Sequence, residues 1–283
     1  MKKKFLNLCV ISSLALLVSG CATKIPVEKQ VGQLNLQTIN IKQEPSTNKT
    51  LGIVEPEFHY QTTQNKVQTQ YSQNPLLAQF MAAKMQQTTF SPTQYFQKSY
   101  QNRLKQALET SIENILIKKG FKLKGPYNSF DDITYQDKKE IYLAVIPKVN
   151  LDIKKVVTFR KCENLYCTEK GKIYFGGNVI ITLEEPLTRQ IFMKKRINLS
   201  DANIEENFIY QHQISTKTGD LTADLINKAT APAKLVDNTD KVMVDGINKF
   251  YIYAVKKLNT YLNREELLSY SKDVEKLKSL KRF

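Results

Sequence analysis

The sequence has no tryptophan, two histidines and four cysteines among its 283 residues. So few Cys and His side chains argue against a rich metal site or a Cys/His catalytic centre. His59 and His212 are isolated in the sequence, and we expect structural or solvent-facing roles for both.

Known catalytic motifs are also missing: there is no glycine-rich phosphate loop, H-E-x-x-H, G-x-S-x-G or paired C-x-x-C. Adjacent acids such as Glu184 and Glu185 point apart in a strand or helix, so adjacency makes no catalytic dyad. The sequence therefore predicts neither an enzyme nor a bound cofactor or metal. A glycosidase with a hidden carboxylate pair is the enzymatic alternative.

Positive charge is in excess, with 42 Lys+Arg against 27 Asp+Glu and a formal net charge of +15. Hydrophobic residues make up 41% of the chain, which is enough for a folded core and excludes wholesale disorder.

The N-terminus has the parts of an export signal. Lys2, Lys3 and Lys4 precede an apolar run, Phe5 to Val18, whose 14 residues are too few for the roughly 20 of a membrane-spanning helix. Val18-Ser19-Gly20-Cys21 resembles the bacterial lipobox. We expect residues 1–20 to be a lipoprotein signal peptide and Cys21 to carry the lipid; an ordinary signal peptide with a chance cysteine is the alternative.

Ala22 stands where an Asp would often retain a lipoprotein at the inner membrane, so resemblance to other lipoproteins favours the outer membrane. We expect the chain on the cell surface, with the periplasmic face as the alternative. In that oxidising location Cys162 and Cys167 are predicted to form a disulfide that contributes about 2 kcal/mol. Two free thiols are the alternative.

Composition divides the rest of the chain. Residues 21–50 are polar and predict a flexible stalk, and residues 51–283 predict a single domain. Within it, the Gln-rich stretch 61–89 is expected to be a loop or insertion, in which 76–85 allow a short helix.

Hydrophobic periodicity predicts an α+β domain. A capping box at Ser91 and a glycine cap at Gly120 bound a helix of about 27 residues. Short turns join the strands that follow, which predicts an antiparallel meander covered by long amphipathic helices. The expected strands are 141–146 (ended by Pro147), 149–161, 173–183 and 190–199, and the later helices are 204–210, 221–229, 240–262 and 263–281.

Basic residues gather in two of these strands: Lys154, Lys155, Arg160 and Lys161 in one, and Arg189, Lys194, Lys195 and Arg196 in or beside the other. Strict alternation would place Lys154 and Arg160 on one face and Lys155 and Lys161 on the other. Guanidinium and ammonium groups suit the carboxylates and phosphates of anionic glycans or lipopolysaccharide, whereas nucleic acid is not expected for an exported protein. A solvated strand face is the alternative.

The placed strands and helices, in order and together with the lipobox, resemble the neuraminyllactose-binding haemagglutinin family of Helicobacter-type adhesin lipoproteins. The resemblance is carried by residues 54–60, 138–145, 181–186, 198–200, 268–273 and 276–278. It implies a surface lipoprotein that binds sialylated glycans. The counterpart of the family's basic sialic-acid motif is 154–161, which keeps basic residues at both ends but lacks the motif's glutamine. The alternative is an envelope or flagellar-sheath lipoprotein that binds another protein or a second copy of itself.

Overall fold

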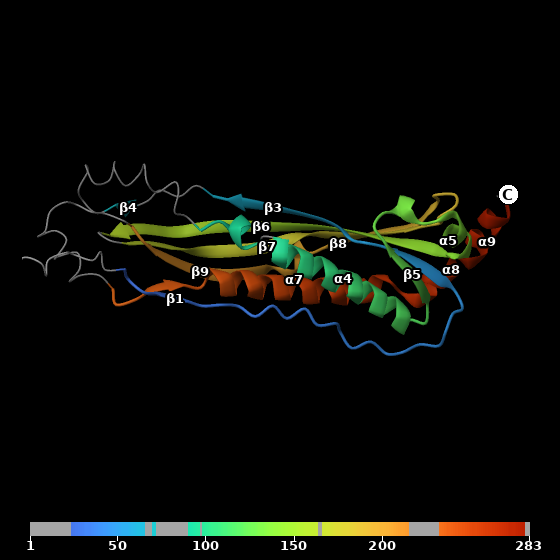
Figure 1. The fold of residues 1–283 in the computed structure, drawn as a ribbon, viewed down its shortest axis with the longest axis horizontal. Coiled ribbons are helices and arrows are strands. Elements are labelled where there is room, and N and C mark those ends of the chain that lie inside the picture. The colour runs from blue at the N-terminus through green and yellow to red at the C-terminus, as the bar shows by residue number, and fades with distance from the viewer. Residues whose placement is uncertain are drawn as a thin grey trace, which may run out of the picture.

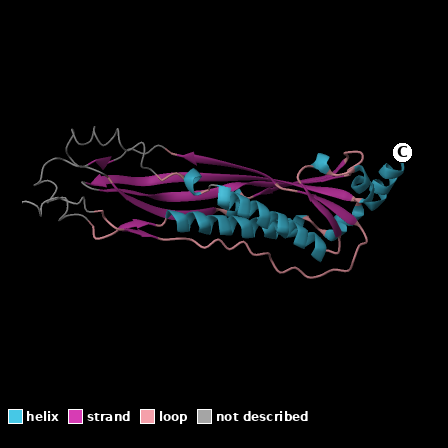
Figure 2. Ribbon diagram, in the orientation of Figure 1, coloured by secondary structure: helices cyan, strands magenta, loops and turns pink. Residues whose placement is uncertain are grey.

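The structure, a computed structural model, describes residues 24–65, 70–71, 90–96, 98–163, 166–214 and 232–280. The molecule is elongated, and its strands form one 10-stranded sheet with long helices lying along one face (Figures 1 and 2). The signal peptide and Cys21 lie outside the described residues.

A long hairpin forms the middle of the sheet. Its strands, β6 (Leu143–Glu163) and β7 (Tyr166–Glu184), are antiparallel, and β7 alternates buried and exposed residues. The other edge of β7 pairs antiparallel with β8 (Ile191–Asn198) and then with β9 (Ile204–Gln213). The antiparallel part of the predicted sheet is confirmed.

The prediction of a purely antiparallel meander is wrong, because the free edge of β6 pairs with parallel strands. These are β2 (Thr50–Val54), β3 (Glu57–Gln64) and β4 (Gln70–Tyr71). After β2 and β3 the chain returns through helices and enters β5 (Lys122–Tyr127) parallel to β2, as such a crossover requires. At the other edge of the sheet, β1 (Val27–Lys29) runs parallel to β10 (Leu235–Asp237).

Two strand predictions change for local reasons. β6 does not end at Pro147, which lies between the residues that pair with β2 and those that pair with β3. A proline without a backbone donor is tolerated at such a gap in the ladder. Residues 204–210 form β9 rather than the predicted helix. The buried residues Ile204 and Phe208 are four positions apart, and this spacing fits one face of a helix as well as one face of a strand, so the pattern alone does not distinguish the two.

The predicted first helix is divided into α3 (Pro92–Tyr95) and α4 (Lys98–Lys118). Between them Phe96 is fully buried, with its ring centroid 4.9 Å from that of Tyr60 on β3, and the Ser91 side chain makes no capping hydrogen bond. The glycine cap is confirmed, because Gly120 has a φ of 84° and Phe121 N donates to Leu116 O at 3.1 Å.

The helix predicted at 240–262 is confirmed as α7 (Thr239–Tyr261). The single helix predicted at 263–281 is divided at Tyr270 into α8 (Arg264–Ser269) and α9 (Ser271–Leu280). A short helix that the sequence did not predict, α5 (Tyr135–Glu140), covers the far end of the sheet. The helices predicted at 76–85 and 221–229 fall outside the described residues. No helix in the described ranges is both long and apolar enough to cross a bilayer.

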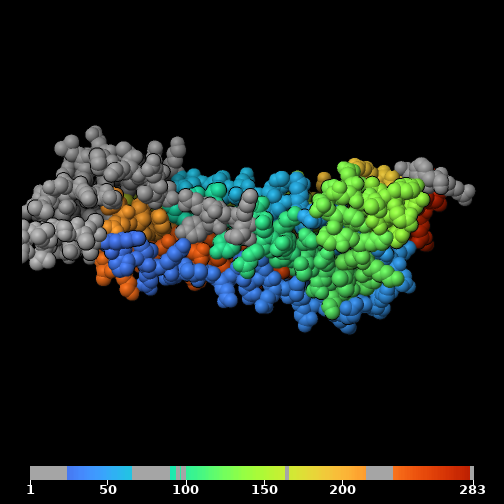
Figure 3. Space-filling view, in the orientation of Figure 1, coloured from blue at the N-terminus to red at the C-terminus, as the bar shows by residue number. Residues whose placement is uncertain are grey.

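The segment predicted as a stalk lies along the helices from residue 24 onward (blue in Figures 1 and 3). Leu34, Leu36, Ile39 and Ile41 pack half-buried against the core. Asn35 N donates to Asn248 Oδ1 at 2.8 Å. These contacts fix the described part of the segment to the domain.

Candidate functional site

A β-bulge decides how the basic strand is presented. The β6–β7 register shifts between Val157 and Phe159, so that Thr158 is an extra residue. The strict alternation predicted for 154–161 is therefore wrong. Lys155 before the bulge and Arg160 after it lie on the helix-covered face, while Lys154 and Lys161 are exposed.

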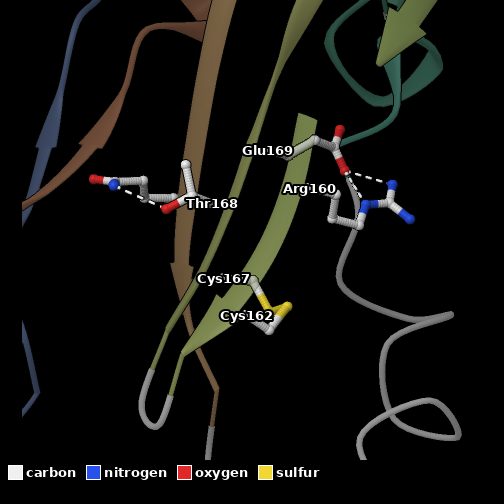
Figure 4. The surroundings of a disulfide bond; sticks show 6 residues. Arg160, Cys162, Cys167, Thr168 and Glu169 are labelled. Carbon is white, nitrogen blue, oxygen red and sulfur yellow. Dashed lines mark hydrogen bonds and ion pairs between the residues drawn. A yellow bond between two sulfur atoms is a disulfide. The ribbon is translucent and has the colours of Figure 1, made fainter. Parts of the chain in front are cut away.

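Lys155 and Arg160 share one buried carboxylate. Arg160 lies directly opposite Glu169 on β7 and donates to its Oε2 from Nη2 at 2.6 Å and from Nε at 3.1 Å (Figure 4). Lys155 forms an ion pair with Oε1 of the same group. The Lys155 and Glu169 side chains are 0% and 2% exposed, so their charges compensate each other inside the protein.

Aromatic rings enclose this buried ion cluster. Lys155 Nζ donates to Phe90 O at 2.5 Å and lies 5.0 Å from the Phe90 ring centroid and 5.4 Å from that of Phe208. Burial lowers the pKa of Lys155, against the opposing effect of the Glu169 charge. Burial also lowers the pKa of His212, whose ring stacks on that of Tyr210 with 5.1 Å between the ring centroids. A lysine in these surroundings holds the fold together and reaches no external ligand.

The disulfide closes the tip of the same hairpin. Cys162 and Cys167 are directly opposite each other, both are buried, and their sulfur atoms are bonded (Figure 4). Thr168 points to the opposite side of the sheet from Glu169. The bond fixes the end of the strands that carry the basic residues.

The other side of the sheet presents a mixed aromatic and basic surface, which we call the open face. At its centre Lys154 lies directly opposite Tyr174, which is 36% exposed, and Thr63 of β3 pairs with Lys154 on its other side. Beyond Tyr174, Glu205 forms an ion pair with Lys172 at 2.7 Å. The phenol ring of Tyr174 thus has the ammonium groups of Lys154 and Lys172 on neighbouring positions of the sheet.

A row of amides crosses the open face next to this centre. Asn150, Asn178 and Asn198 are register partners on β6, β7 and β8, with His59 of β3 beside Asn150. Asn150 Nδ2 donates to Asn178 Oδ1 at 3.0 Å. Amide side chains both donate and accept hydrogen bonds, which suits sugar hydroxyl groups. Sequence reasoning missed this row because its members come together only through strand register.

The second basic group is divided in the same manner. Lys194 and Arg196 are exposed on β8, whereas Lys195 pairs with Glu266 of α8 and Arg189 pairs with Asp131. Among the residues that the structure describes, no three His, Cys, Asp or Glu side chains are grouped to hold a metal ion.

Comparison with known proteins decides the family. The family model described as neuraminyllactose-binding hemagglutinin precursor matches residues 12–281. The chain belongs to the neuraminyllactose-binding hemagglutinin family. A family member from Helicobacter pylori strain 26695, named neuraminyllactose-binding hemagglutinin, is 26% identical over 191 residues, 64% of this chain and 70% of its own length. A relative of the same name from strain J99 is 26% identical over 192 residues.

A solved structure shows a similar fold. It is described as that of a neuraminyllactose-binding hemagglutinin homolog from Helicobacter pylori, covering 85% of this chain and 100% of its own, with a TM-score of 0.54 and 16% identity. The named relatives are called hemagglutinins, and their names give no enzymatic activity.

Proposed function

We propose that this chain is a lipid-anchored protein of the bacterial cell surface that binds sialylated or otherwise anionic glycans without catalysis. The observation that carries the proposal is that two exposed residues, Lys154 and Tyr174, lie directly opposite each other on neighbouring strands. They are on the open face of the sheet in a protein of the hemagglutinin family. Of the four basic residues predicted as the site, Lys154 is the proposed glycan contact, and Lys155 and Arg160 hold the buried Glu169.

The chemistry of this centre fits an acidic sugar. An aromatic ring offers a flat apolar surface for one face of a pyranose ring, and a lysine supplies a point charge for a carboxylate. The neighbouring asparagines add donors and acceptors for hydroxyl groups. One shallow contact of this kind binds weakly, at about millimolar dissociation constants, and many copies on one membrane compensate through multivalency.

The anchor is proposed from the lipobox at Cys21. Several acyl chains on one cysteine hold a protein on a bilayer essentially permanently, since each buried CH₂ contributes about 0.8 kcal/mol. The family relation favours glycan binding over a purely structural role in the envelope or flagellar sheath.

The test is a matched pair of lysine substitutions. Lys154→Ala is expected to weaken binding to neuraminyllactose about fivefold, the effect of losing roughly 1 kcal/mol from a charged contact. Lys256→Ala on the exposed side of α7 removes the same charge and is expected to leave binding unchanged. Binding is measured on a glycan array and by titration, with circular dichroism to check the fold. Equal binding by both variants would remove Lys154 from the site.

A further inference from the structure

The chain enters the fold at the tip of the long hairpin. Ile25 is buried, and its N–H donates to Oε1 of Gln213, the residue of β9 that pairs with Tyr166 at the turn. Two residues later β1 begins its pairing with β10 at Val27 and Leu235. Figure 1 shows β1 at one end of the long axis and the C-terminal helices at the other.

This entry point limits where a membrane can lie. Four residues of extended chain, from Cys21 to Ile25, span at most about 14 Å. If Cys21 carries the lipid, as the proposed function holds, the surface of the bilayer lies within that distance of the hairpin tip. The far end, with α5, α8 and α9, then points away from the membrane.

We propose that this anchor end, residues 24–29, 159–163, 166–170, 209–214 and 232–237, rests on the membrane and contacts the phosphate-bearing headgroups of the lipids. Its charge is complementary to that surface. Among the described side chains of these segments, the exposed charged groups are one acid and five lysines: Glu28, Lys24, Lys29, Lys161, Lys170 and Lys234. Lysines close to an anionic bilayer surface each add attraction within a Debye length.

An aromatic side chain completes the surface. Phe159 is 37% exposed, and Lys170 Nζ lies 5.9 Å from its ring centroid. Protein surfaces that lie in the membrane interface typically combine Phe, Trp or Leu side chains with Lys and Arg. The proposal therefore assigns Lys161 to the lipid surface rather than to a glycan.

The same geometry separates the lipid-contacting tip of the hairpin from the proposed glycan site farther along the strand. From Cys162 to Lys154 the strand rises about 26 Å at 3.3 Å per residue. Lys154 and Tyr174 would then stand clear of the headgroups and remain accessible to a glycan while the tip is in contact with lipid.

The absence of tryptophan allows a direct test. Phe159→Trp, Tyr174→Trp and Tyr135→Trp each introduce the single tryptophan of the chain, at the tip, on the open face and on α5. The lipidated full chain is inserted in phosphatidylcholine vesicles containing phosphatidylglycerol, with and without a lipid spin-labelled on its headgroup. We expect about twofold or greater quenching in the tip variant, because apolar groups at a membrane interface are buried about 5–10 Å into the headgroup and acyl boundary, close to the spin label. Quenching should be weaker in the open-face variant and absent in the α5 variant.

Two controls separate this inference from the proposed function. Intact mass and vesicle flotation establish the lipid on each variant, and a chain without lipid would overturn the anchoring and this orientation together. A lipidated chain in which Tyr135→Trp is quenched and Phe159→Trp is not would overturn the orientation alone, leaving glycan binding to its own test. Lys161→Gln with Lys170→Gln should reduce the phosphatidylglycerol-dependent part of the quenching, unlike Lys256→Gln with Lys276→Gln; equal effects would contradict the charged contact.

Discussion

Glu169 determines the role of two neighbouring basic residues. Its carboxylate is buried near the tip of the hairpin and takes an ion pair from Lys155 and two hydrogen bonds from Arg160. A buried carboxylate without such partners would be strongly unfavourable, so both cations are required by the fold. The exposed Lys154 has no part in this cluster. Comparing Lys154 with its buried neighbour Lys155 therefore tests how much the buried ion pair stabilises the fold.

Replacing each lysine by methionine should therefore change the stability of the protein by very different amounts. Lys155→Met leaves Glu169 with one cation fewer in a desolvated position, and we expect the free energy of unfolding to fall by about 3 kcal/mol. Lys154→Met on the exposed side should change it by less than about 0.5 kcal/mol. Urea unfolding followed by circular dichroism measures both. Equal losses would show that the two lysines are in similar surroundings.

For single residues, the sequence predicted which cysteines are bonded but not which face of the sheet each basic side chain lies on. The cysteine pair was correctly matched from its spacing and location, and the structure bonds Cys162 to Cys167. The side-chain directions of Arg160 and Lys161 were not predictable, because one extra residue at Thr158 reverses the alternation beyond it. Nothing in the local composition marks that bulge.

Among the elements, long periodic segments were predictable and short polar ones were not. The α7 helix has a continuous apolar stripe, and β6–β7 are rich in β-branched residues, so their types follow from the chain alone. β3 is polar at most positions, and its second half, 61–64, was assigned to an insertion; this half becomes strand because the free edge of β6 needs a partner. Tertiary pairing, rather than propensity, decides such strands.

The contact between α7 and the sheet depends on a glycine. A Cβ added at Gly246 would lie 2.0 Å from Cε2 of Phe175 on β7, so helix and strand approach more closely than an alanine permits. We expect Gly246→Ala to lower the free energy of unfolding by about 1–3 kcal/mol, because overpacking outweighs the gain in helix propensity.

Thr260→Ala, at an exposed position of the same helix, is the control and should be neutral or slightly stabilising. Thermal and urea denaturation of the two variants give the comparison. A more stable Gly246→Ala variant would mean that the helix lies farther from the sheet than the structure places it.

Across the whole molecule, one elongated sheet separates two surfaces. The helices and the N-terminal segment cover one face (Figures 1 and 3). The strand register places Lys154, Tyr174 and the asparagine row on the open face, between the anchor end and the far end. This arrangement could not be predicted from sequence, since the parallel strands that widen the sheet and the position of β1 depend on pairings between distant segments. The lipobox and the family resemblance, by contrast, were visible in the chain itself.

The claim that the open face binds acidic glycans is tested most directly by amide NMR of the unacylated Cys21→Ser chain, titrated with neuraminyllactose and, separately, with lactose. We predict concentration-dependent shifts at Lys154, Tyr174 and their register partners with neuraminyllactose and much smaller shifts with lactose, because the carboxylate provides the contact with lysine. Shifts confined to the helix-covered face, or equal shifts with both sugars, would contradict the claim.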